Sequence, residues 1–173
     1  MIKPLLLLSL LFCLCACDSE KDSQPTAVFN EFVFSQSGMY ENYSIKFTKS
    51  DTVFLEERFP EPSKRYFALL NDTLLKNLNF ILDTLNLERF DNSYIQENLQ
   101  DGVFIKFHLR SDSMNKTIGI YGHEAPPSFY PVAKWLDNLT KTLTKHPTTK
   151  SIDFGDLSGI NPPPAPPPPK LEH

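Results

Sequence analysis

The sequence contains little cysteine and little glycine: three cysteines and six glycines in 173 residues. No cysteine follows Cys17, which excludes a disulfide, a cysteine-ligated metal site and a catalytic thiol from the rest of the chain. The chain also lacks the Gly-x-Ser-x-Gly motif of many hydrolases and a glycine-rich loop that could cradle phosphate. These absences exclude the most common signatures of nucleophilic hydrolases and of nucleotide-binding enzymes.

Basic residues are scarce relative to acidic ones. Lysine and arginine total 17 against 21 aspartate and glutamate residues, and the formal net charge is −4. An acidic chain without a basic stripe is poorly suited to bind nucleic acid, so we expect no nucleic-acid partner. After residue 17, no apolar run approaches the roughly 20 residues of a transmembrane helix.

The candidate catalytic and metal-binding residues are few. His108 and His123 fall on one predicted hairpin. Residues that pair across it should have numbers that sum to about 226, which places the two histidine rings roughly 15 Å apart along the strands. This separation is too large for the two rings to share one zinc ion. Ser113 and Lys116 match the Ser-x-x-Lys motif, but in a predicted turn, and Asp153-Phe154-Gly155 occurs without any other kinase element. We therefore predict no catalytic, cofactor-binding or metal-binding residue.

The N-terminus has the order of a secretory signal peptide. Lys3 supplies a short positive region, and residues 5–14 are apolar except for Ser9. The closing residues Leu14-Cys15-Ala16-Cys17 resemble the lipobox of bacterial lipoproteins. The resemblance implies that residues 1–16 are removed and that Cys17, as the first residue of the mature chain, carries a diacylglycerol. The alternative is an ordinary secretory signal in which Cys17 is incidental.

The lipoprotein resemblance implies a membrane partner, because two or more acyl chains on Cys17 would attach the protein stably. Residues 17–26 are predicted to be the lipidated cysteine and a polar tether. The acidic stretch 18–22 is similar to a surface-export signal of some bacterial lineages. In other lineages, an aspartate directly after the lipidated cysteine indicates retention in the inner membrane. We expect a location in the cell envelope, with the outer membrane or cell surface preferred over the inner membrane.

Residues 27–145 are predicted to form a single domain. Alternating apolar residues predict strands over 27–34, 43–48, 53–59, 64–70, 103–109 and 117–121. Apolar residues at helical spacing predict a helix from Leu74 to Leu85, capped by Asn71 or Asp72, and a second helix capped by Ser128. The polar segment 91–101 is predicted to be a loop. The predicted fold class is therefore α+β: an antiparallel sheet of about five to six strands with two helices packed on one face.

The second predicted hairpin closes on Ile120-Tyr121-Gly122-His123-Glu124-Ala125-Pro126, directly before the last helix. A Tyr-Gly-x-x-x-Pro-like segment at this point, after a hairpin, a helix and a second hairpin, is similar to an uncharacterised group of small bacterial lipoprotein domains. The likeness spans residues 29–140. Some members carry a cysteine pair in the first hairpin, which this sequence lacks. Because the group has no activity to transfer, the resemblance implies a fold rather than a function.

Residues 146–173 are predicted to be a tail, in which the proline-rich stretch 161–169 forms an extended spacer or docks on an aromatic groove. The leading functional hypothesis is a non-enzymatic, membrane-anchored binding or accessory domain without a cofactor. The alternatives are an inhibitor or immunity-type lipoprotein, which would use an open sheet face or edge, and an unrecognised envelope hydrolase. Tyr121, Phe129 and Tyr130 are the candidate surface for an unknown envelope protein or ligand.

Overall fold

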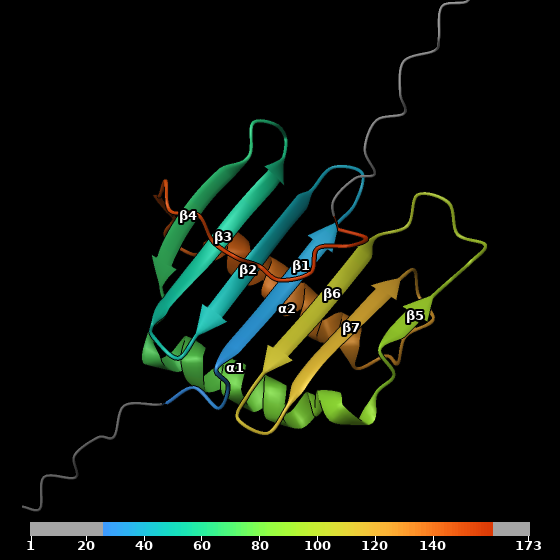
Figure 1. Ribbon diagram of the computed structural model, residues 1–173, viewed down its shortest axis with the longest axis horizontal. Helices are drawn as coiled ribbons and strands as arrows, with labels where there is room; N and C mark the ends of the chain where they lie inside the picture. The colour runs from blue at the N-terminus through green and yellow to red at the C-terminus, as the bar shows by residue number, and fades with distance from the viewer. Residues whose placement is uncertain (1–25, 161–173) are drawn as a thin grey trace, which may run out of the picture.

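The computed structural model describes residues 26–160 of the chain. The predicted signal peptide, the lipidation site Cys17, nearly all of the tether and the proline-rich stretch 161–169 lie outside the described residues. The described part forms an α+β domain in which one mixed sheet carries two helices on the same face (Figure 1).

The sheet has eight strands among the described residues, in the order β5-β7-β6-β1-β2-β3-β4-β8. Neighbouring strands are antiparallel, except that β5 and β7 run parallel. The central strand β1 pairs with β2 on one side and with β6 on the other. The strands are β1 (Glu31–Ser37), β2 (Asn42–Thr48), β3 (Thr52–Phe59), β4 (Lys64–Leu69), β5 (Ser93–Ile95), β6 (Phe104–Arg110), β7 (Asn115–Tyr121) and β8 (His146–Pro147).

Alternation along the central strands separates apolar from polar side chains. Successive residues of a strand point to opposite faces, so Phe32 and Phe34 lie on the helix side of β1 while Glu31 and Ser35 lie on the other side. The core on the helix side is built largely from phenylalanine rings. The fully buried rings are Phe29, Phe32, Phe34, Phe47, Phe107 and Phe129. Tilted or stacked pairs among such rings contribute about 0.5–1.5 kcal/mol each beyond the burial of their area.

The helices are α1 (Asp72–Leu85) and α2 (Phe129–Thr142). Asn71 caps α1, because its side chain accepts a hydrogen bond from the Leu74 amide at 2.9 Å. This part of the prediction is confirmed. Ser128 precedes α2, but its backbone is already helical and its side chain makes no capping bond. The predicted serine cap is therefore wrong.

The predicted α+β class with two helices on one face is confirmed, but the sheet is larger than five to six strands and is not purely antiparallel. β5 lies inside the segment 91–101, where the sequence predicts a loop, and β8 lies inside the predicted tail. Both strands span only two or three residues, too few for an alternating pattern to be visible. A short 3₁₀ helix (Leu87–Arg89) follows α1.

Two predicted positions shift within the central strands. The first strand begins at Glu31, whereas the alternating pattern predicts 27–34. In the β6–β7 hairpin, His108 pairs with Thr117, one residue from the predicted partner Ile118. The predicted register is therefore off by one residue, because Ser111 and Met114 close the turn with a backbone hydrogen bond.

Residues 148–160, here called the strap, continue from β8 across the face of the sheet that carries no helix (Figure 1). The strap contacts side chains of β3, β2 and β6 in turn. The folded domain therefore includes residues 146–160, which lie beyond its predicted end at residue 145.

Candidate functional site

The sheet face beneath the strap is polar, and we call it the polar face. Its side chains occupy the alternate positions of the central strands, opposite to the apolar core positions. The polar ones are Glu31, Ser35, Asn42, Ser44, Lys46, Glu56, Arg58, Arg65, Lys106, His108 and Arg110, and the apolar side chains of Val33, Phe54 and Phe104 lie on the same face. Several of them are buried although they are polar or charged, which is uncommon and costly unless each group is paired.

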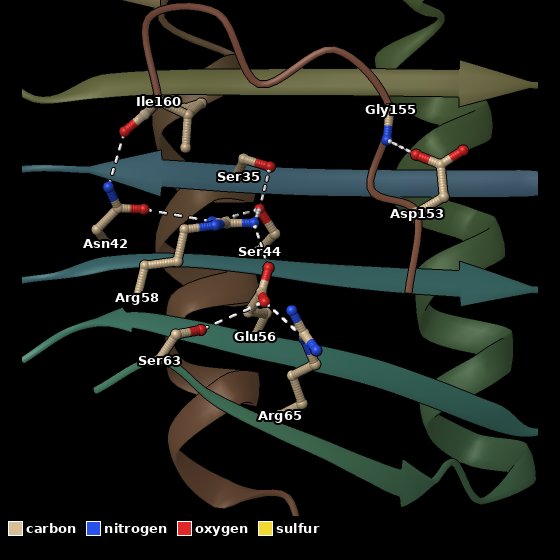
Figure 2. A network of polar contacts seen from close by, with 10 residues as sticks. All are labelled: Ser35, Asn42, Ser44, Glu56, Arg58, Ser63, Arg65, Asp153, Gly155 and Ile160. Atoms are coloured by element: carbon tan, nitrogen blue, oxygen red, sulfur yellow. Dashed lines mark hydrogen bonds and ion pairs between the residues drawn. The ribbon is translucent and has the colours of Figure 1, made fainter. Parts of the chain in front are cut away.

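A charged network spans strands β1 to β4 on the polar face (Figure 2). Glu56 lies between two arginines, with its Oε2 at 3.1 Å from Arg58 Nη2 and its Oε1 at 2.7 Å from Arg65 Nε. Ser63 donates a further hydrogen bond to Glu56. Because the Glu56 side chain is almost entirely out of solvent, these three donors replace the water that its carboxylate has lost.

Arg58 extends this network toward β1. Its guanidinium donates to Ser44 Oγ at 3.0 Å and to Asn42 Oδ1 at 3.3 Å, and Ser44 Oγ lies 2.6 Å from Ser35 Oγ. Burial lowers the pKa of Arg58 and the Glu56 carboxylate opposes this effect, but an arginine remains protonated at neutral pH. Within residues 26–160, every buried side-chain nitrogen and oxygen has a hydrogen-bond partner. The buried polar side chains of the polar face are thus all hydrogen-bonded.

Two lysines of the polar face hold the strap. Lys46 Nζ donates to the Asp153 carbonyl at 2.7 Å. Lys106 Nζ donates to the Asp156 carbonyl at 3.0 Å, to Asp156 Oδ2 at 3.0 Å and to Ser158 Oγ at 3.1 Å. Lys106 is only 7% exposed, so the strap supplies the acceptors for all three hydrogens of a nearly buried ammonium group.

Two apolar side chains of the strap are buried against the sheet. Phe154 is 4% exposed and its ring lies 5.6 Å from the Arg58 guanidinium carbon, a cation–π contact. Ile160 is fully buried, and Asn42 Nδ2 donates to its carbonyl at 2.7 Å. Full burial of such a side chain contributes about 1.5–3 kcal/mol.

Two turns, formed by residues of the strap itself, determine the shape of the strap. The Asp153 carboxylate accepts a hydrogen bond from the Gly155 amide, and the Asp156 carboxylate accepts one from the Ser158 amide. Gly159 has φ +77°, and a Cβ at this position would lie 2.7 Å from the Phe104 ring, so the close passage over β6 requires glycine. These turn residues are the signal in the sequence that residues 148–160 are ordered.

A second charged group lies beneath the middle of the strap. Glu31 Oε2 is 2.8 Å from Lys46 Nζ and 3.2 Å from Arg110 Nη2, and its Oε1 is 4.0 Å from His108 Nε2. Partial burial raises the pKa of Glu31, but the hydrogen bonds and charges of Lys46 and Arg110 outweigh it, so its pKa lies below the usual value. Burial lowers the pKa of His108, and the Glu31 charge opposes this effect only in part.

The polar face opens into a depression of about 690 Å³ at the end of the sheet, between the β1–β2 loop, the β3–β4 loop and the strap. Its lining includes Asn42, Glu56, Arg58, Phe59, Pro62 and Leu157. Met39 and Tyr40 in the β1–β2 loop are exposed, with Tyr40 at 80%, and Phe59 is also partly exposed. This end of the sheet therefore combines a charged depression with exposed apolar side chains at Phe59 and in the adjoining β1–β2 loop.

The three residues predicted as a partner surface do not form an exposed aromatic patch. Phe129 is 1% exposed and packs between Phe90 and Phe107, so it is a core residue. Tyr121 is half-buried, and its hydroxyl donates to the Leu99 carbonyl and accepts from the Gly102 amide. Tyr130 is half-buried, and its hydroxyl accepts from the Ala125 amide. All three rings serve to hold α2 and the neighbouring loops in place.

The other residues considered from the sequence also remain apart. His108 contacts Thr117 Oγ1 at 2.8 Å on the polar face, whereas His123 lies after β7 near the Tyr130 ring. Ser113 lies in the β6–β7 turn and Lys116 on β7. Among the described residues, no group of three or more His, Cys, Asp or Glu side chains could hold a metal ion.

Sequence comparison matches no known protein-family model and finds no curated protein similar to this chain. Between residues 26 and 160, neither helix has the length and apolar composition needed to cross a membrane.

Proposed function

We propose that this protein is a lipid-anchored lipoprotein of the bacterial cell envelope whose domain acts as a non-enzymatic binding module. The observation that supports binding is the polar face together with the depression at its end, where a paired charged network meets exposed apolar side chains. Arginine, methionine and aromatic side chains, such as Arg58, Met39 and Tyr40 here, are enriched at surfaces that recognise another protein. The lipobox-like residues Leu14-Cys15-Ala16-Cys17 support the anchor at Cys17, with the outer membrane or cell surface as its location.

The place where the described chain begins supports a binding site that faces away from the membrane. Asn79 of α1 donates to the Thr26 carbonyl and accepts from the Val28 amide, so the described chain begins beside α1. The β1–β2 and β3–β4 loops, whose residues line the depression, lie at the opposite end of the strands (Figure 1). A tether that ends at Thr26 would therefore leave the depression turned away from the membrane.

Acyl labelling and membrane fractionation test the anchor. Cys17→Ser should abolish labelling and release the protein into the soluble fraction. Cys15→Ser is the matched control and should leave both unchanged, because serine keeps a small residue at this lipobox position. Undiminished acylation of the Cys17→Ser protein would refute the anchor.

In-cell crosslinking tests the binding function. A photoreactive residue in place of Tyr40 should give an adduct with an envelope component, whereas the same residue in place of the exposed Lys76 on α1 should not. The absence of an adduct at position 40 overturns the binding proposal. Turnover of an envelope substrate by the purified protein would favour the hydrolase alternative instead.

A further inference from the structure

The strap resembles a bound peptide more than a part of the sheet. It follows β8 but joins no ladder of its own, and side chains of the polar face hold it. Three of these contacts go to main-chain carbonyls, those of Asp153, Asp156 and Ile160. Protein grooves hold peptides in trans in a similar way, with hydrogen bonds to the peptide main chain for affinity and a few side-chain contacts for specificity.

Removal of the strap would leave the rest of the fold complete. The β1–β2, β2–β3 and β1–β6 ladders do not involve it, and the phenylalanine core lies on the opposite face under the helices. The side chains that would be uncovered include hydrophilic ones, such as Ser44, Lys46 and Lys106, whose lost partners water can replace. They also include the apolar side chains of Val33, Phe54 and Phe104. Opening therefore costs chiefly the burial of Phe154 and Ile160 in the strap and of Val33 beneath it.

We propose that the polar face is a peptide-binding groove that the strap occupies in cis, and that an acidic segment of another protein takes its place. This inference rests on the binding function proposed above and assigns the chemical class of the partner. The strap itself shows the preferred pattern: an aromatic residue two positions before an aspartate, as in Phe154-Gly155-Asp156.

Charge complementarity supports an acidic partner. The polar face carries five basic side chains and two acidic ones. The basic ones are Lys46, Arg58, Arg65, Lys106 and Arg110, and the acidic ones are Glu31 and Glu56. Each glutamate is already paired with two of these basic side chains. The net positive face therefore attracts carboxylates and disfavours a basic segment.

The cis arrangement also sets how tightly a free peptide can bind. A segment joined to its own groove acts at an effective concentration on the order of millimolar, so a peptide in trans competes poorly while the strap is intact. Substitutions confined to the strap should free the groove without altering it.

A fluorescent peptide with the sequence of residues 150–160 provides the test, measured by anisotropy on the full mature chain with Cys17→Ser. The Phe154→Ala/Asp156→Ala variant, changed only in its strap, should bind this peptide at least tenfold more tightly than the chain with an intact strap. Addition of Lys106→Met to that variant should lower the affinity at least tenfold. A peptide that carries alanine in place of its phenylalanine and second aspartate is the matched control and should not bind.

Equal affinity of the intact and strap-substituted chains for the peptide would overturn the proposal, as would equal binding of the alanine peptide. Hydrogen exchange on the unsubstituted chain gives a second measurement that does not depend on any variant. Residues 150–160 should exchange at least tenfold faster than β1, β2 and β6, and exchange only through global unfolding would contradict an opening strap. If the crosslinked envelope component binds equally well to the strap and Lys106 variants, the binding function stands and the groove assignment fails.

Discussion

Lys106 and Asp156 join the sheet to the strap across fifty residues of sequence, with Lys106 Nζ at 3.0 Å from Asp156 Oδ2. The lysine is nearly buried, whereas 69% of the aspartate side chain is exposed to solvent. The strap thus brings a solvated carboxylate down to an ammonium group that the sheet alone would leave without a charged partner. This asymmetry makes the strap contact sensitive to the protonation of Asp156.

Acid should therefore loosen the strap. The Ser158 amide, Lys106 and the Ser158 hydroxyl lower the pKa of Asp156 to about 2. Because the folded pKa is depressed, the contact is fully present above the unfolded value near 3.8 and is lost as the pH falls toward about 2. Hydrogen exchange or NMR of residues 150–160 between pH 5 and pH 2 would measure the loss. Asp156→Asn should loosen the strap already at neutral pH, and an unchanged acid transition in this variant would contradict the assignment.

Removal of the Glu56 charge should destabilise the domain. Glu56→Gln leaves the half-buried Arg58 without its carboxylate partner, and breaking a buried pair in this way costs about 3–5 kcal/mol. Urea unfolding measures the change. Glu61→Gln in the exposed β3–β4 loop is the control and should stay within about 0.5 kcal/mol of the original. Arg58→Met added to Glu56→Gln should recover part of the loss, and a further loss of similar size would argue against the pair.

His108 should make the stability depend on pH between neutral and mildly acidic conditions. Burial lowers the pKa of His108 below the usual histidine value of 6.5, so the unfolded chain binds a proton at a higher pH than the folded chain does. Stability should consequently fall as the pH drops from 6.5 toward the lower folded value. His108→Gln should flatten this dependence in urea unfolding at pH 7.5 and pH 5, whereas His123→Gln, at an exposed position, should not. Equal curves for the original protein and His108→Gln would contradict the prediction.

Phe129 should behave as a core residue. Phe129→Ala removes a fully buried ring and should lower the free energy of unfolding by about 3–5 kcal/mol. Phe80→Ala on α1 removes the same side chain from a site that is 71% exposed and should change it by less than about 0.5 kcal/mol. A small effect of Phe129→Ala on stability would reopen its assignment to a partner surface.

The two helix starts should respond differently to alanine. Asn71→Ala removes the side-chain acceptor of the Leu74 amide and should cost about 1 kcal/mol. Ser128→Ala removes no capping bond and should cost clearly less. Thermal unfolding of the two variants makes the comparison, and a larger loss for Ser128→Ala would show that this serine does cap α2.

The main strands and both helices of the fold could be predicted because their patterns are local. Phe32, Phe34, Ile45 and Phe47 repeat at the period of a strand, and Leu78, Leu82 and Leu85 repeat at the period of a helix. β5 and β8 could not be predicted, since two or three residues contain no measurable period and their pairing is decided by β7 and β4. The candidate site was missed for a related reason. Ser44, Lys46 and Lys106 occupy positions that face solvent in an ordinary one-sided sheet, and no local pattern reveals that a distant segment covers them.

The sequence by itself determined the division of the chain into strands and helices, the α+β class and the side of each strand that faces the core. These properties depend on the spacing of apolar residues over a few turns or alternations. Only the tertiary structure decided that residues 148–160 cross the polar face, that Lys106 meets Asp156 and that Phe129 is core. Each of these depends on contacts between residues far apart in sequence, and their energies arise only after the sheet has brought the partners together.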